Sequence, residues 1–315
     1  MTSVFAPHEP YRQRAFALTP DPAFLYLAQS HRAALEALRA GVDEGAAFMV
    51  LTGEVGTGKT TILRALCAGL PETVTTAFVG NPALSFADIL YTLLAEVGHQ
   101  PASMRKADLL ADFAKFLVTE HGRGRTVLVI VDEAQHLSAP VVQDLLMLSD
   151  LEGDASRLVH FLLAGQPELT AMLQRPEVHQ LQRRITVRTT LRPLTRPETA
   201  AYIAHRLRSA RVSSACRFTT DAVDRIFELS EGIPRMINHI CQSALEAGHR
   251  AGTSVIAADT VDLGSPHLVE REGGISRLIP RRRVRTLVRV AEVTVLAILV
   301  TILGLALAFV PRSMP

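Results

Sequence analysis

The stretch that decides the fold is FMVLTGEVGTGKT, residues 48–60. Its first five residues are apolar or β-branched, which predicts a short strand buried in a parallel sheet. The rest fits the pattern G-x-x-x-x-G-K-[ST], in which a glycine-rich loop wraps its backbone N–H groups around phosphate oxygens. Helical apolar spacing follows Lys59, so a helix should begin there and point the positive end of its dipole at the same phosphates. The sequence therefore predicts a nucleotide site.

Two side chains of this loop have distinct expected tasks. Lys59 should reach the β- and γ-phosphates, and the Thr60 hydroxyl should bind Mg²⁺. Glycine at positions 53, 56 and 58 allows the left-handed backbone that turns the N–H groups inward. We expect ATP and Mg²⁺ as ligands, with nucleotide contacts from Gly53, Glu54, Val55, Gly56, Thr57, Gly58, Lys59, Thr60 and Thr61.

Polar residues also follow two later apolar runs. Asp132 and Glu133 come directly after TVLVIV, residues 126–131. Asp132 is the second expected contact to Mg²⁺, through water, and Glu133 is placed to polarise the water that attacks the γ-phosphate. An acidic pair alone could equally be solvated carboxylates, but beside a phosphate loop it favours ATP hydrolysis. Gln166 follows a third apolar run, residues 158–164, and either orients the same water or is an ordinary loop glutamine.

Several segments together resemble the general secretion pathway protein A type of AAA+ ATPase. They are GEVGTGKTT, VLVIVDEAQHL, LLAGQPEL, QLQRRITVR, EGIPRMINHIC and the early FALTPDPAFLYLAQSH, and they extend over most of residues 16–263. The resemblance implies an α/β fold, with an αβα core around a parallel sheet and a helical lid, working as a homo-oligomer. It also implies that Arg183 or Arg184 reaches the γ-phosphate of the next subunit, and that Arg235 contacts the nucleotide from the lid. The alternatives are a basic helix end and a surface charge, respectively.

Local signals place the lid helices. Thr195-x-x-Glu198 has the form of a capping box, and we expect a helix from Ala200 to about Ser209. A second helix should follow Thr220 and end before Gly232. A third should begin near Pro234, because proline is tolerated in the first turn of a helix.

The end of the chain predicts a membrane anchor. Residues 293–310 are uncharged, and a span over 290–310 would be long enough for a hydrocarbon core. The arginines at 281–289 favour a cytosolic ATPase domain at the inner membrane, with residues 311–315 as a short outer tail. Some proteins of the resembled type carry a peptidoglycan-binding region after the span, and that function is not carried over to these five residues. The body has no apolar leader and three scattered cysteines, which is consistent with a reducing compartment. Its net negative charge counts against general binding of polyanions.

We therefore expect an N-terminal segment and helix (1–45), an ATPase core (46–192), a lid (193–263), a basic hinge (264–289), a span (290–310) and a tail (311–315). The expected function is a membrane-anchored ATPase that assembles or remodels an envelope machine of the secretion or polysaccharide-export type, with inner-membrane and envelope proteins as partners. One alternative is a DNA-binding ATPase of the transposition-helper type. Its phosphate-tracking patch would consist of Arg183, Arg184, Arg188, Arg192 and Arg196. Another is a nucleotide-gated scaffold.

Overall fold

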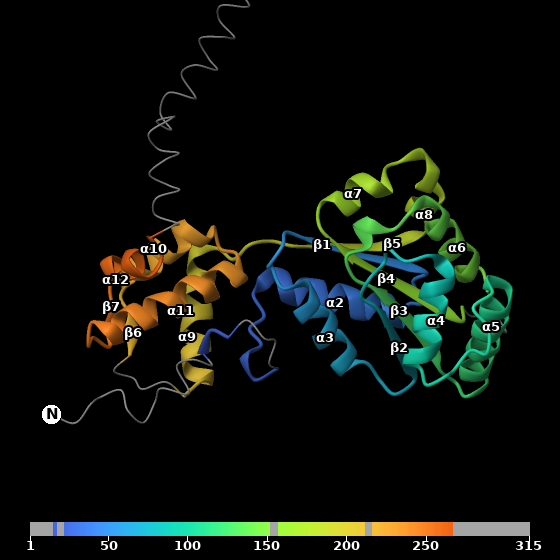
Figure 1. Ribbon diagram of the computed structural model, residues 1–315, viewed down its shortest axis with the longest axis horizontal. Helices are drawn as coiled ribbons and strands as arrows, with labels where there is room; N and C mark the ends of the chain where they lie inside the picture. The colour runs from blue at the N-terminus through green and yellow to red at the C-terminus, as the bar shows by residue number, and fades with distance from the viewer. Residues whose placement is uncertain (1–14, 18–21, 152–156, 212–215, 267–315) are drawn as a thin grey trace, which may run out of the picture.

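A five-stranded parallel sheet organises the larger of the two lobes (Figure 1). The computed structural model describes residues 15–17, 22–151, 157–211 and 216–266. The strand order is β2-β3-β4-β1-β5, so the strand before the phosphate loop is flanked on both sides. The strands are β1 (Phe48–Gly53), β2 (Val74–Val79), β3 (Thr126–Val131), β4 (Val159–Gly165) and β5 (Ile185–Leu191).

The register of the sheet brings the predicted polar residues together at the carboxyl ends of the strands. Thr52 of β1 pairs with Gly165 of β4, and Val131 of β3 pairs with Leu163. Because all these strands are parallel, the segments that leave their carboxyl ends meet at the same edge of the sheet. The phosphate loop, the acidic pair and Gln166 are therefore neighbours.

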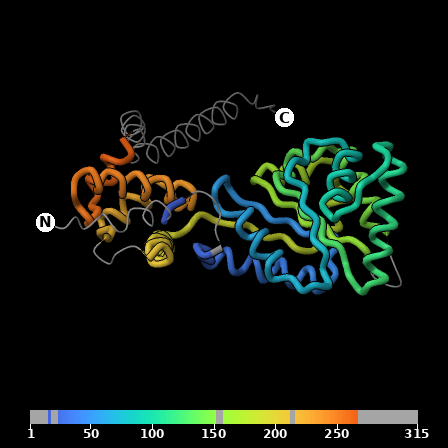
Figure 2. The backbone as a smooth tube through the Cα atoms, turned by 60° about the horizontal axis from the view of Figure 1, so that its bottom comes forward, coloured from blue at the N-terminus to red at the C-terminus, as the bar shows by residue number. Residues whose placement is uncertain are grey.

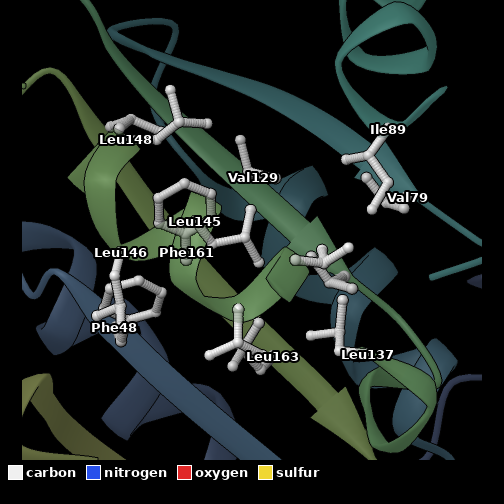
Figure 3. Packing of buried hydrophobic residues seen from close by; sticks show 14 of the residues in the cluster. Phe48, Val79, Ile89, Val129, Leu137, Leu145, Leu146, Leu148, Phe161 and Leu163 are labelled. Atoms are coloured by element: carbon white, nitrogen blue, oxygen red, sulfur yellow. The ribbon is translucent and has the colours of Figure 1, made fainter. Parts of the chain in front are cut away.

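Helices cover both faces of the sheet, as the alternation of buried side chains requires. Phe48 of β1 stacks on Phe161 of β4 at 5.0 Å between ring centroids, on the face that α4, α5 and α6 cover (Figure 3). Met49 and Leu51 point to the other face and pack against α2 and α3. The helices of this lobe are α2 (Gln29–Asp43), α3 (Lys59–Gly69), α4 (Phe86–Glu96), α5 (Lys106–Gly122), α6 (Ala139–Ser149), α7 (Glu168–Leu173) and α8 (His179–Arg184), with short 3₁₀ turns at Ala134–His136 and Pro176–Val178. A further 3₁₀ turn, Pro22–Phe24, packs on the smaller lobe.

The smaller lobe is the helical lid, and it has a hydrophobic core of its own. It consists of α9 (Arg196–Ser209), α10 (Thr220–Ser230), α11 (Pro234–Arg250) and α12 (Ala258–Gly264), with a two-residue ladder between β6 (Arg217–Phe218) and β7 (Val255–Ile256). Residues 15–17 pack here, as the blue segment among the orange helices shows (Figure 2). Phe16 lies edge-on to Phe218, and Arg206 donates hydrogen bonds to the carbonyls of Ala15 and Ala17 at 2.6 and 3.0 Å.

The lid helices follow their predicted signals with one shift. The capping box is present in full, with the Thr195 hydroxyl and the Glu198 carboxylate each bonded to the other's backbone N–H. Helix α9 begins at Arg196, four residues before the expected Ala200, because Pro197 fits the first turn. Helices α10 and α11 begin at the expected positions, and α12 was not predicted.

Within residues 15–17, 22–151, 157–211 and 216–266, no helix is long and apolar enough to cross a membrane. The predicted span at 290–310, the outer tail and most of the basic hinge lie outside the described residues.

Candidate functional site

The phosphate loop links β1 directly to α3, and two of its three glycines have the left-handed backbone that was expected of them. Gly56 and Gly58 have φ values of 84° and 104°. The expectation was wrong for Gly53, which has no positive φ because it is the last residue of β1 and pairs with Leu191 in the sheet. The Lys59 side chain is buried, and its ammonium donates to the carbonyls of Gly53 and Glu54 at 2.7 and 3.2 Å. Burial lowers the pKa of Lys59, and the nearby carboxylates of Glu133 and Asp132 oppose that shift. The ammonium thus lies within the loop that is expected to bind phosphate.

The side chains of Thr60 and Asp132 are in contact next to the phosphate loop. The Thr60 hydroxyl donates to Asp132 Oδ2 at 3.0 Å, and the backbone N–H of Glu133 donates to Asp132 Oδ1 at 2.9 Å. A hydroxyl and a carboxylate side by side are hard oxygen donors of the kind that Mg²⁺ prefers, with most of its remaining ligands left to water and phosphate. The two predicted metal contacts are therefore close enough to share one ion.

Glu133 has two amide neighbours. Gln135 and Gln166 both donate to Glu133 Oε2, at 2.6 and 3.1 Å. The hydrogen bond from Gln135 lowers the pKa of Glu133; burial opposes it, and the bond from Gln166 and the Lys59 charge add to it. Glu133 itself has a left-handed backbone, with φ at 51°. This arrangement keeps an ionised carboxylate beside the phosphate loop, with Oε2 bound to the two amides.

Gln135 was not among the sequence candidates, whereas Gln166 was. The signal for Gln135 was its position two residues after Glu133, in a 3₁₀ turn that brings its side chain back to the end of β3. His31 was also missed. It is buried on α2, and its Nε2 lies 2.9 Å from the Thr57 carbonyl of the phosphate loop. Nothing in the local sequence distinguished that histidine from an ordinary core residue.

Arg183 and Arg184, the two candidates for the arginine that reaches the next subunit, lie at the opposite end of the strands from the phosphate loop. Arg183 and Arg184 end α8 just before β5, whose first residue, Ile185, pairs with the first residue of β1. Arg184 forms an ion pair with Asp150 and donates to Ser149 Oγ at 3.1 Å. Arg183 is exposed, and no hydrogen bond or ion pair joins it to the described residues. Both line a hollow of about 390 Å³, together with Glu44, Gly45, Ala46, Ala47, Arg157 and Thr186.

The lid touches the loop through the start of α11. The backbone N–H of Arg235 donates to the Gly56 carbonyl at 3.2 Å. A Cβ added at Gly56 would lie 2.7 Å from Arg235 Cβ and 3.1 Å from Ile233 Cγ2, so only glycine fits under the lid at this contact. The Arg235 side chain is exposed beside the loop. Of the remaining loop residues, Val55 is exposed, and Thr57 is buried with its hydroxyl on the Glu54 carbonyl at 2.8 Å.

The five arginines of the alternative DNA patch are partly neutralised. Arg184 pairs with Asp150, and Arg196 pairs with Asp224. Arg188 donates to the Gln182 carbonyl at 3.3 Å. Two of the five positive charges are therefore already opposed by carboxylates.

Comparison with known proteins agrees with this geometry. Residues 42–173 match the model of an AAA domain. Over 251 residues the chain is 38% identical to the general secretion pathway protein A of Aeromonas hydrophila, and the match covers 79% of this chain. The chain is an AAA ATPase of the general secretion pathway protein A type. The match covers only 46% of that relative, so the chain spans about half of its length.

Solved structures share the fold at low sequence identity. The ORC2 protein of Aeropyrum pernix, in ADPNP and ADP complexes, superposes with a TM-score of 0.60 at 20% identity, over 81% of this chain and 71% of that one. Cdc6p of Pyrobaculum aerophilum gives 0.64 at 16% identity, over 81% and 70%. The branch-migration motor RuvB of Thermotoga maritima gives 0.51 at 20% identity, over 76% and 69%. These likenesses establish the AAA-like α/β architecture of this AAA ATPase.

Proposed function

We propose that this AAA ATPase hydrolyses ATP at the edge where the phosphate loop, Asp132 and Glu133 meet. The loop N–H groups and Lys59 bind the β- and γ-phosphates. Glu133 accepts a proton from a water whose oxygen forms a new bond to the γ-phosphorus, while the bond to the β–γ bridging oxygen breaks and ADP leaves. The observation that carries the proposal is the ionised Glu133 carboxylate, held by two amides beside a buried lysine.

Thr60 and Asp132 are the residues that would hold Mg²⁺. When bound, the ion neutralises negative charge on the phosphate oxygens. Asp132 is itself fixed by the Glu133 N–H, so the metal contact and the proposed base are parts of one backbone turn.

The proposed assembly is a homo-oligomer in which Arg183 completes the site of the next subunit. Arg184 is engaged with Asp150 and Ser149, which leaves Arg183 as the more available guanidinium at the end of α8. A guanidinium brought to the γ-phosphate stabilises the charge of the transition state.

The proposed work of the enzyme is to assemble or remodel an envelope machine, of the secretion or polysaccharide-export type, from the cytosolic side of the inner membrane. The secretion-pathway relative and the apolar stretch 290–310 support this proposal. Carbonate-resistant sedimentation of the full chain with membranes, lost on deletion of 290–310, is the expected result. A full chain that washes off membranes in carbonate would contradict the anchor.

The catalytic proposal is tested with three variants of the full chain. Glu133→Gln should bind ATP normally but lower its turnover by about 10²- to 10⁴-fold, the usual contribution of a general base. Lys59→Ala should lose tight ATP binding. Glu177→Gln, an exposed carboxylate in the turn before α8, is the matched control and should behave as wild type. Wild-type turnover by Glu133→Gln or Lys59→Ala would refute the site.

Duplex DNA provides a separate test of the partner class. Because two arginines of the alternative patch are paired with acids, we expect turnover to be unchanged by DNA across a salt series. Strong stimulation that fades steeply with salt would instead favour the DNA-binding alternative.

A further inference from the structure

Gln135 joins the ends of two neighbouring strands at the proposed catalytic edge. It lies in the 3₁₀ turn Ala134–His136, directly after Glu133 at the end of β3. Its side-chain nitrogen donates to Glu133 Oε2 at 2.6 Å, and its side-chain oxygen accepts the backbone N–H of Gln166 at 3.1 Å, just beyond β4. One amide therefore connects the carboxylate to the neighbouring strand.

The direction in which this amide faces is fixed by chemistry. A backbone N–H can only donate, so the Gln135 oxygen must be the atom that faces Gln166 N. The amide NH₂ must then face Glu133, whose ionised carboxylate can only accept. Gly165 makes room for this arrangement, because a Cβ added there would lie 2.5 Å from Gln135 Oε1. A leucine at 135 would leave Gln166 N and Glu133 Oε2 without these partners.

We propose that Gln135 is the positioning residue of the hydrolysis reaction, holding Glu133 Oε2 so that Oε1 is presented to the attacking water. The proposal rests on the proposed function of Glu133. Gln166 donates to the same oxygen through its side chain, which comes from another strand. If Gln166 turns toward the γ-phosphate when ATP binds, Gln135 still holds the carboxylate.

Two substitutions at 135 separate the amide from the bulk of the side chain. Gln135→Leu keeps most of the volume but removes the donor to Glu133 Oε2 and the acceptor of the Gln166 N–H. Gln135→Asn is the conservative variant, because it keeps the donor and the acceptor of the amide on a stem that is one methylene shorter.

The rate effect should appear in kcat. We expect kcat of the full-length Gln135→Leu chain to fall about 10- to 100-fold at neutral pH, the cost of a misplaced base, with KM for ATP within about threefold of wild type. Gln143→Leu is the matched control, since Gln143 is an exposed glutamine of α6. It should leave kcat and KM unchanged, whereas Gln135→Asn should recover part of the kcat that Gln135→Leu loses.

The outcomes separate this proposal from the one on which it depends. If Glu133→Gln abolishes turnover while Gln135→Leu keeps wild-type kcat, the positioning role is wrong and the catalytic site stands. A loss in Gln135→Leu that appears in KM as much as in kcat, or that Gln135→Asn does not reduce, would make Gln135 a structural residue only and also refute the proposal. If Glu133→Gln turns over ATP like wild type, the proposed function fails first.

Discussion

Arg183 lies too far from its own phosphate loop to act on it. Phe48 of β1 pairs with Ile185, the residue that follows α8, while Gly53 at the other end of β1 pairs with Leu191. Five residue steps of about 3.3 Å separate these ends, so the arginine starts about 17 Å from the loop of its own chain. That is much longer than an arginine side chain. We therefore predict that Arg183 contributes to hydrolysis only in a neighbouring subunit.

Mixing two inactive variants tests this prediction quantitatively. Arg183→Ala alone should lower ATP turnover by about 10³-fold or more, as for other arginines that reach the γ-phosphate. Lys59→Ala alone should be inactive but keeps its arginine. In an equal random mixture, half of the subunits carry a complete loop and half of their donor neighbours carry Arg183. About a quarter of the interfaces should then work, giving about a quarter of wild-type turnover for head-to-tail contacts.

The assay is phosphate release at constant total protein while the mixing ratio varies. The subunits are mixed at a dilution at which turnover per subunit still rises with concentration. Restored activity should be largest at the equal mixture and fall to zero at both ends. A rate that equals the sum of the separate variants at every ratio would refute the shared site. Arg184→Ala offers a comparison, because Asp150 already engages the Arg184 side chain. Mixing Arg184→Ala with Lys59→Ala should raise turnover above the sum of the separate variants by less than the Arg183→Ala mixture does.

Three further predictions concern the loop, the lid and the base. Gly56→Ala should weaken ATP binding more than Gly98→Ala does: both glycines have a positive φ, near 80°, but only the Cβ at 56 would meet Arg235, whereas nothing lies within 4 Å at 98. Equal binding by the two variants would contradict the lid contact. Thr195→Ala should lower the free energy of unfolding by about 1 kcal/mol through loss of the helix cap, measured by urea denaturation, and an unchanged midpoint would exclude the cap's contribution. Because the pKa of Glu133 is lowered, this carboxylate stays ionised at pH values below the usual range of a glutamate. Turnover should fall only as the pH drops through that lowered pKa. Loss of turnover at the pH where an ordinary glutamate is protonated would contradict the effect of the two amide hydrogen bonds on Glu133.

Much of the ATPase core was predictable because its strands, loop and helix caps depend on short patterns of neighbouring residues. The strands β1, β3 and β4 are buried on both faces, so their sequences are apolar runs that stand out without an alignment. The loop and the capping box depend on residue types at fixed spacing, and both were placed correctly. The edge strands β2 and β5 were not identified, because half-buried threonines interrupt the apolar pattern of β2, and exposed threonines and an exposed arginine interrupt that of β5.

The parts of the site that were missed depend on contacts between distant residues. His31 reaches Thr57 across the packing of α2 against the sheet, and no local signal at residue 31 announces that contact. Gln135 becomes notable only once β3 and β4 are paired and Gln166 N comes within 3.1 Å of its oxygen. Similarly, the sequence offered Arg183 and Arg184 as equivalents, and it is the contacts of Arg184 with Asp150 and Ser149 that distinguish them.

The position of Lys59 changes how its substitution should be read. The ammonium donates to the carbonyls of Gly53 and Glu54, so the lysine links two backbone groups at the start of the loop. Alanine at 59 would remove these two hydrogen bonds as well as the proposed contact to phosphate. A loss of ATP binding by Lys59→Ala would therefore be the sum of two losses, one in the shape of the loop and one in its charge.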